Sequence, residues 1–145
     1  MTANTNDYRS RYKCSDGALG SGRRLDSTAQ AALDAAFARG KLVISGAVFA
    51  ELLALPRRTE AFIEEFLRET GIGVDWITDE AIGRVAGKAF QAYANRRRKQ
   101  RSGEPRRLLA DFLIGAHAVE NGFALLTLDD GIYRAAFPKL RIVKV

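Results

Sequence analysis

Short strand-like runs alternate with longer segments that have a helical spacing of apolar residues, and this alternation covers most of the chain. The runs lie at residues 42–44, 74–77, 124–127 and 140–143. Parallel strands need crossover connections between them and are buried on both faces. The alternation therefore predicts a three-layer α/β fold, in which a parallel sheet is flanked by helices. At 145 residues, the chain has the length of one such domain.

The segments between these runs carry the start and stop signals of helices. Gly40, Gly71 and the pair Asn121-Gly122 follow helical patterns as C-terminal caps, and Pro56 ends another pattern. In sheets with helical crossovers, ligands bind beyond the carboxyl ends of the strands. Helices are expected at about residues 28–38, 47–55, 59–69, 78–95, 108–120 and 132–136.

The N-terminal part of the chain differs from the rest. Residues 1–26 contain no alternating or helical run of apolar side chains, so we expect an irregular segment there and a folded domain at residues 27–145. The chain has no apolar run long enough to cross a membrane and no apolar core of a secretory signal. Its single cysteine, Cys14, excludes an internal disulfide and fits a reducing compartment. These features indicate a cytoplasmic protein.

Three acidic residues occupy positions where carboxylates are unusual. Asp111 begins an apolar helix, Glu51 lies within another, and Asp129 follows a strand. A carboxylate in apolar surroundings needs a partner or a cation. Because Mg²⁺ and Mn²⁺ prefer carboxylate oxygens, the three acids predict a divalent-metal site, supported by Thr127 beside Asp129. Such an ion activates a water molecule and orients a phosphodiester for in-line attack.

Each acid also has a separate structural explanation. Glu51 could pair with an arginine, Asp111 could cap its helix, and Asp129 could lie in a surface turn. The only histidine, His117, is six residues beyond Asp111 and so lies on a different face of the helix. We therefore expect His117 to be structural and not a ligand.

A basic segment directly precedes Asp111, in a chain with a net charge of +6. Charge runs are usually solvated surface, but this position makes the segment a candidate RNA contact. It is expected to form a loop. The aromatic residues Trp76, Phe62, Phe66 and Phe90 are expected in the core or at an interface, with no paired platform for base stacking. The basic residues of the segment are Arg96, Arg97, Arg98, Lys99, Arg101, Arg106 and Arg107.

Three stretches of the chain resemble the motifs of PIN-domain ribonucleases, and most closely the VapC-type toxins of bacterial toxin–antitoxin pairs. They are residues 43–53, 111–118 and 125–129, and the resemblance extends over about residues 28–145. It implies a PIN-like fold and a divalent-metal endoribonuclease, usually dimeric and held inactive by an antitoxin encoded beside it. Glu51, Asp111 and Asp129 match the second, third and fourth acids of the family.

The family's first motif is missing from this chain. The family begins with a central strand that ends in an acid, as in V-V-D-T-S-A-L, and nothing before residue 27 has this pattern. We therefore expect the first central strand to be absent or replaced by an irregular N-terminus. One choice of codons for residues 8–16, when translated from its second base, encodes T-V-V-D-T-S-A-L, which is the missing motif. A change of reading frame near the N-terminus is thus a hypothesis, and the nucleotide sequence of the gene tests it.

Two functions from different classes remain open on this basis. The first is a divalent-metal endoribonuclease whose activity would be impaired if catalysis needs the missing first acid. The second is a catalytically inactive PIN-like protein that binds an antitoxin or RNA. A basic nucleic-acid-binding module unrelated to nucleases is a weaker third reading.

Overall fold

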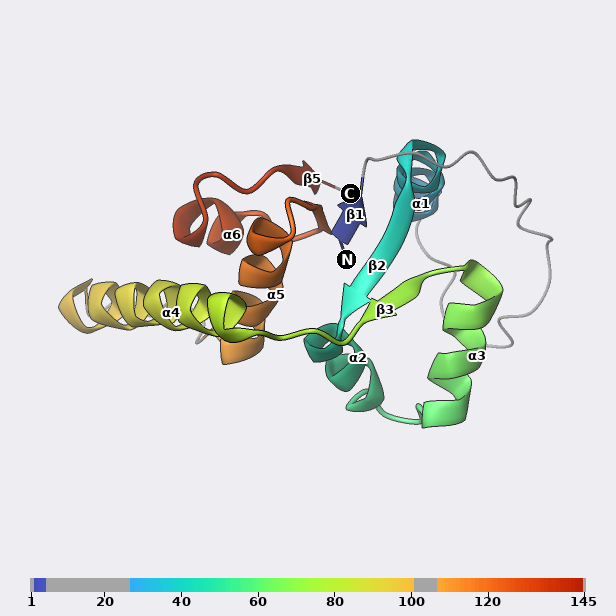
Figure 1. Cartoon of the computed structure of the whole chain (residues 1–145), viewed down its shortest axis with the longest axis horizontal. Coiled ribbons are helices and arrows are strands. Elements are labelled where there is room, and N and C mark those ends of the chain that lie inside the picture. The colour runs from blue at the N-terminus through green and yellow to red at the C-terminus, as the bar shows by residue number, and fades with distance from the viewer. Residues whose placement is uncertain (1, 5–26, 101–106, 145) are drawn as a thin grey trace.

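The computed structural model of the chain describes residues 2–4, 27–100 and 107–144 (Figure 1). Strands and helices alternate along the domain, as the sequence predicts. The elements in chain order are β1 (Thr2–Asn4), α1 (Ser27–Arg39), β2 (Lys41–Ser45), α2 (Gly46–Leu53), α3 (Glu60–Thr70), β3 (Gly73–Asp75), α4 (Glu80–Gln100), α5 (Leu109–Glu120), β4 (Ala124–Thr127), α6 (Gly131–Ala136) and β5 (Ile142–Lys144).

The sheet has the order β3-β2-β1-β4-β5. Strand β2 pairs parallel with β3, and β4 pairs parallel with β5. Strand β1 pairs antiparallel with both β2 and β4. Because each is antiparallel to β1, β2 and β4 run in the same direction, and their carboxyl ends lie at the same edge of the sheet. The predicted α/β class with parallel strands is confirmed.

The N-terminus departs from the expected irregular segment at residues 2–4, which form strand β1 in the middle of the sheet. This strand was not foreseen because Thr2–Asn4 has no apolar run, and its pairing comes from the neighbouring strands through the backbone. The expectation for residues 5–26 lies outside the residues that the structure describes.

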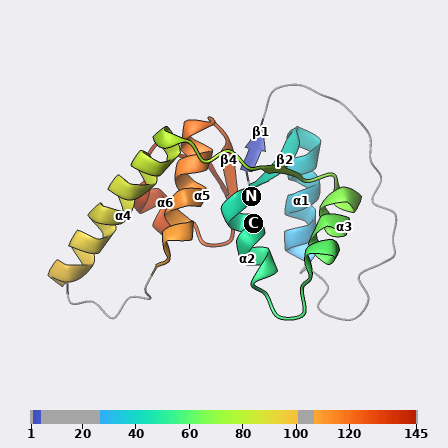
Figure 2. The ribbon, with the colours of Figure 1, turned by 60° about the horizontal axis from the view of Figure 1, so that its bottom comes forward.

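The core has a separate cluster of buried side chains on each face of the sheet. On β4, Leu125 packs with residues of α4, α5 and α6, whereas the adjacent Leu126 packs with residues of α1, β2 and α3. Consecutive strand residues point to opposite faces, so the two clusters are the two sides of one sheet. Figure 2 shows α4, α5 and α6 to one side and α1 and α3 to the other. This is the predicted arrangement of a sheet flanked by helices.

The helix ends follow local sequence signals. The hydroxyl of Thr59 accepts a hydrogen bond of 3.2 Å from the backbone N–H of Phe62, which caps the start of α3. Gly71 ends α3 with φ of 70°, a left-handed conformation that glycine adopts without a steric penalty. None of the described helices is long and apolar enough to cross a membrane.

The basic segment was predicted wrongly as a loop over its first half. Arg96, Arg97, Arg98 and Lys99 continue helix α4, which reaches Gln100. Basic side chains in the last turn favour this extension because the carbonyl end of a helix carries partial negative charge. Arg101 and Arg106 lie outside the described residues.

Candidate functional site

Two of the predicted acids lie on helices that pack against each other. Glu51 is in the last turn of α2, Asp111 is in the first turn of α5, and these two helices are in contact. Glu51 is exposed and Asp111 is half-buried. Partial desolvation raises the pKa of Glu51, and the negative charge of Asp111 raises it further. The two carboxylates are therefore close enough to repel each other.

The side chain of Asp111 also forms a capping hydrogen bond with the backbone at the start of its helix. Its Oδ2 atom accepts a hydrogen bond of 3.2 Å from the N–H of Leu108. This N–H belongs to the N-cap residue of α5 and has no partner within the helix. The capping explanation for Asp111 is thus present in the structure, and it fixes the carboxylate at the head of α5.

Asp129 lies just beyond β4 and forms an ion pair. Its Oδ2 atom is 2.6 Å from Nη1 of Arg107, and both side chains keep part of their surface in solvent. Thr127 holds the backbone of Asp129: its Oγ1 atom accepts a hydrogen bond of 3.2 Å from the Asp129 N–H. The same hydroxyl lies 3.3 Å from the Asp129 carbonyl oxygen, to which it donates. Asp129 is therefore held both at its backbone and at its carboxylate.

A buried tyrosine, Tyr133 of α6, lies near all three acids and was missed by the sequence analysis. Burial raises the pKa of its phenol, and the negative charges of Asp111, Glu51 and Asp129 raise it further, in that order of size. The three carboxylates thus act on one side chain. Only the packing of α6 against α5 places Tyr133 there, so no pattern along the chain could have identified it.

The chemistry of these donors fits a hard divalent cation, because carboxylate oxygens are the ligands that Mg²⁺ and Mn²⁺ prefer. Within the described residues, no three Asp, Glu, His or Cys side chains lie close enough together to hold a metal ion. The Oδ2 atom of Asp129 is paired with the guanidinium of Arg107. The three-acid metal site stays a prediction.

Three of the basic residues that the structure describes line one groove, and one of these pairs with Asp129. Arg97 and Arg98 in the last turns of α4, together with Arg107, line a groove of about 400 Å³. Arg107 belongs to both features, because its side chain lines the groove and pairs with Asp129. The acids and the groove are therefore adjacent.

A comparison with protein families gives a match over most of the chain. The family model described as PIN domain matches residues 17–138, which is most of the chain and includes the three acids. No curated protein matches the chain. PIN domains are nuclease-like hydrolases, and they generally depend on a divalent metal.

Proposed function

Because the chain belongs to the PIN domain family, we propose that it is a divalent-metal-dependent endoribonuclease that cleaves RNA phosphodiester bonds as the toxin of a toxin–antitoxin pair. The observation that supports this proposal is that helices α2 and α5, which carry Glu51 and Asp111, are in contact, and that the charges of these two acids and of Asp129 all raise the pKa of Tyr133. We further expect a cognate antitoxin, a homodimer and a cytoplasmic location.

In the proposed reaction, Glu51, Asp111 and Asp129 would hold Mg²⁺ or Mn²⁺. The bound ion would supply a more acidic water molecule and positive charge to offset the charge that develops on the phosphodiester. Thr127 keeps the backbone of Asp129 in place through two hydrogen bonds. Arg107 pairs with Oδ2 of Asp129, so a cation would bind through the other carboxylate oxygen or displace the guanidinium, which can then meet a phosphate oxygen.

The missing first acid bears directly on activity. A central strand parallel to β2 and β4 would deliver its last residue to the edge where Asp129 lies, but the described β1 is three residues long and runs the other way. This short antiparallel strand supports the hypothesis that the N-terminus is out of frame. The nucleotide sequence of the gene tests this hypothesis. If the shifted reading frame encodes no D-T-S-like motif there, the hypothesis is wrong.

Cleavage of labelled RNA with Mn²⁺, with Mg²⁺ and with EDTA tests the proposed function. We expect metal-dependent cleavage that Asp111→Asn abolishes, while Glu120→Gln, an exposed carboxylate change at the other end of α5, leaves it intact. A variant with the first motif restored should cleave faster than the chain as written. Cleavage that survives both EDTA and Asp111→Asn would overturn the metal mechanism.

The inactive binding protein is the other outcome of this experiment. It predicts RNA or antitoxin binding without cleavage, both in the chain as written and after the first motif is restored. Membership of a nuclease-like family does not favour this outcome.

A further inference from the structure

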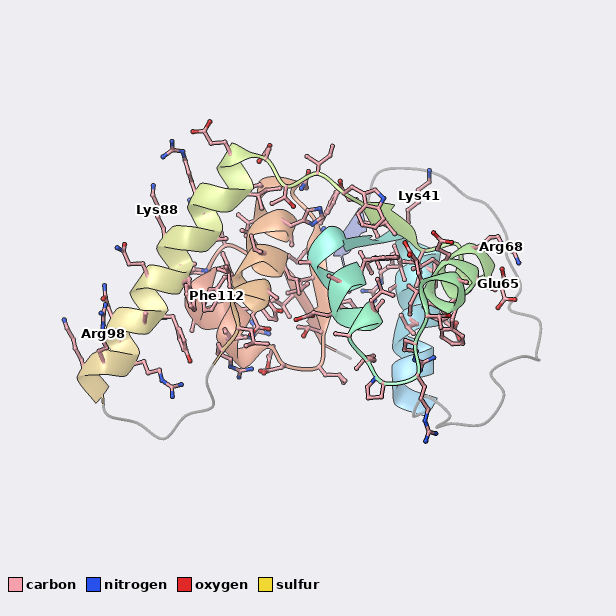
Figure 3. All side chains as sticks on the ribbon, turned by 90° about the horizontal axis from the view of Figure 1, so that it is seen from below. Lys41, Glu65, Arg68, Lys88, Arg98 and Phe112 are labelled. Atoms are coloured by element: carbon pink, nitrogen blue, oxygen red, sulfur yellow. The ribbon has the colours of Figure 1, made fainter. Side chains whose placement is uncertain are left out.

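A groove beside the acidic cluster combines aromatic rings with guanidinium groups. It lies along the second half of α4, and Arg107 at the entry to α5 also lines it. Figure 3 shows Arg98 near the last turn of α4 and Phe112 between α4 and α5. The groove has a volume of about 400 Å³ and is lined by Phe90, Tyr93, Ala94, Arg97, Arg98 and Arg107.

The aromatic wall of the groove is paired and supported from behind. The rings of Phe90 and Tyr93 are within 20° of parallel, with centroids 6.3 Å apart. Both rings contact the ring of Phe112, at 5.1 Å and 5.4 Å between centroids, and Phe112 is fully buried. Phe90 packs against the core, as expected, but its ring is also paired with Tyr93, which the sequence analysis did not foresee. The two residues are three apart on α4 and are therefore neighbours on its surface.

The basic side of the groove is organised around the hydroxyl of Tyr93. This oxygen accepts hydrogen bonds from the backbone N–H of Arg107, at 3.0 Å, and from Nη1 of Arg97, at 3.2 Å. Arg98 bonds to the side chain of Asn95 on the same helix. Two guanidinium groups from the end of α4 and one from the entry to α5 thus border the same aromatic wall.

We propose that this groove binds a single-stranded RNA segment, with a base against the wall of Phe90 and Tyr93 and phosphates on Arg97, Arg98 and Arg107. Base–aromatic stacking needs an unpaired base, which is why single-stranded RNA fits and a duplex does not. Because Arg107 also contacts Asp129, a strand in the groove leads directly to the acids. The inference rests on the proposed function, since it names the segment of substrate next to the bond that is cut.

Binding measured without metal tests the groove separately from catalysis. Fluorescence anisotropy of a short labelled single-stranded RNA in EDTA gives Kd for the chain and for Arg98→Ala. Loss of one charge-assisted contact should raise Kd about tenfold, and it should reduce the salt dependence by about 0.7 in the slope of log Kd against log salt. The matched control is Arg84→Ala, which lies on the same helix but pairs with Glu80 outside the groove.

A second comparison tests whether the bases of the RNA contribute to binding in the groove. An oligonucleotide without bases should bind about fivefold or more weakly than the intact strand, because it lacks the stacking contribution. Equal Kd values for the intact strand and the strand without bases would overturn the RNA assignment. So would binding of poly-glutamate that Arg98→Ala weakens by the same factor as it weakens RNA binding, because an acidic protein partner would then fit the groove as well. Equal Kd values for Arg98→Ala and Arg84→Ala, with both variants folded by circular dichroism, would overturn the groove itself.

The two proposals fail in different ways. Metal-dependent cleavage with unchanged binding in Arg98→Ala would reject the groove and keep the nuclease. Loss of binding in Arg98→Ala, with no cleavage under any metal, would keep the groove and reject the nuclease.

Discussion

The imidazole Nε2 of His117 lies 3.1 Å from Oδ2 of Asp75, and this pair joins helix α5 to the end of strand β3 across 42 residues of sequence. His117 is 2% exposed, and its ring contacts Phe123 edge to face. Asp75 also accepts a hydrogen bond of 3.0 Å from the N–H of Ile77. The expectation of a structural histidine agrees with this geometry, and its partner could not be read from the sequence because only the fold brings them together.

Asp75 should make the folded protein sensitive to acid. The Ile77 N–H lowers the pKa of this carboxyl, and the hydrogen bond and charge of His117 lower it further. A group whose pKa is lower in the folded state stabilises the fold above its unfolded pKa, near 3.9, and loses that contribution as the pH falls through its folded pKa. Urea unfolding at a series of pH values should show this loss in the wild type and a smaller loss in Asp75→Asn. Identical pH dependences would contradict the prediction.

Gly115 should tolerate no side chain. A Cβ atom at this position of α5 would lie 2.2 Å from Cε2 and 2.6 Å from Cδ2 of Phe137, which is itself buried. Gly115→Ala should therefore destabilise the protein by about 1–3 kcal/mol. Gly87→Ala in α4, where nothing lies within 4 Å, should instead stabilise it by about 0.5–1 kcal/mol. Thermal unfolding of both variants measures the contrast, and shifts of the same sign would refute it.

Glu51→Gln should make the fold more stable and RNA cleavage slower. The substitution removes the repulsion between Glu51 and Asp111, as well as a negative charge in the last turn of α2. Because Glu51 is exposed and screened by solvent, the gain should be about 0.2–1 kcal/mol without metal. RNA cleavage should fall in the same variant. Glu64→Gln, an exposed change on α3, should alter neither quantity, and a Glu51→Gln variant that cleaves like the wild type would exclude Glu51 from the site.

Thr127→Val should loosen Asp129 without changing the shape of the side chain. It removes the hydroxyl that accepts from the Asp129 N–H, which should cost about 0.5–1.5 kcal/mol. The rate of RNA cleavage should fall by a larger factor than the fraction of folded protein, because the backbone of Asp129 is no longer held by the Thr127 hydroxyl. Thr127→Ser keeps the hydroxyl and should restore cleavage. Failure of serine to do so would show that the methyl group matters, and not the hydrogen bonds.

Much of the fold could be predicted from local patterns, because apolar runs such as Leu125-Leu126 and caps such as Gly71 act over a few residues. The candidate acids could be found because carboxylates are unusual within apolar helices. Tyr133 could not, because its position depends on how α6 packs on α5. The pairing of Phe90 with Tyr93 was overlooked, although residues three apart on a helix are neighbours. Strand β1 was missed since its pairing uses backbone groups, which every sequence provides.

Under the proposed function, the ion pair between Arg107 and Asp129 would make cation binding at the acids and RNA binding in the groove depend on each other. A cation that takes Asp129 frees the guanidinium for a phosphate, and a phosphate that takes Arg107 frees the carboxylate for a cation. Binding at two coupled sites is reciprocal, so each ligand must tighten the other by the same factor. Substrate and metal would then be bound cooperatively, with Arg107 as one link between the two sites.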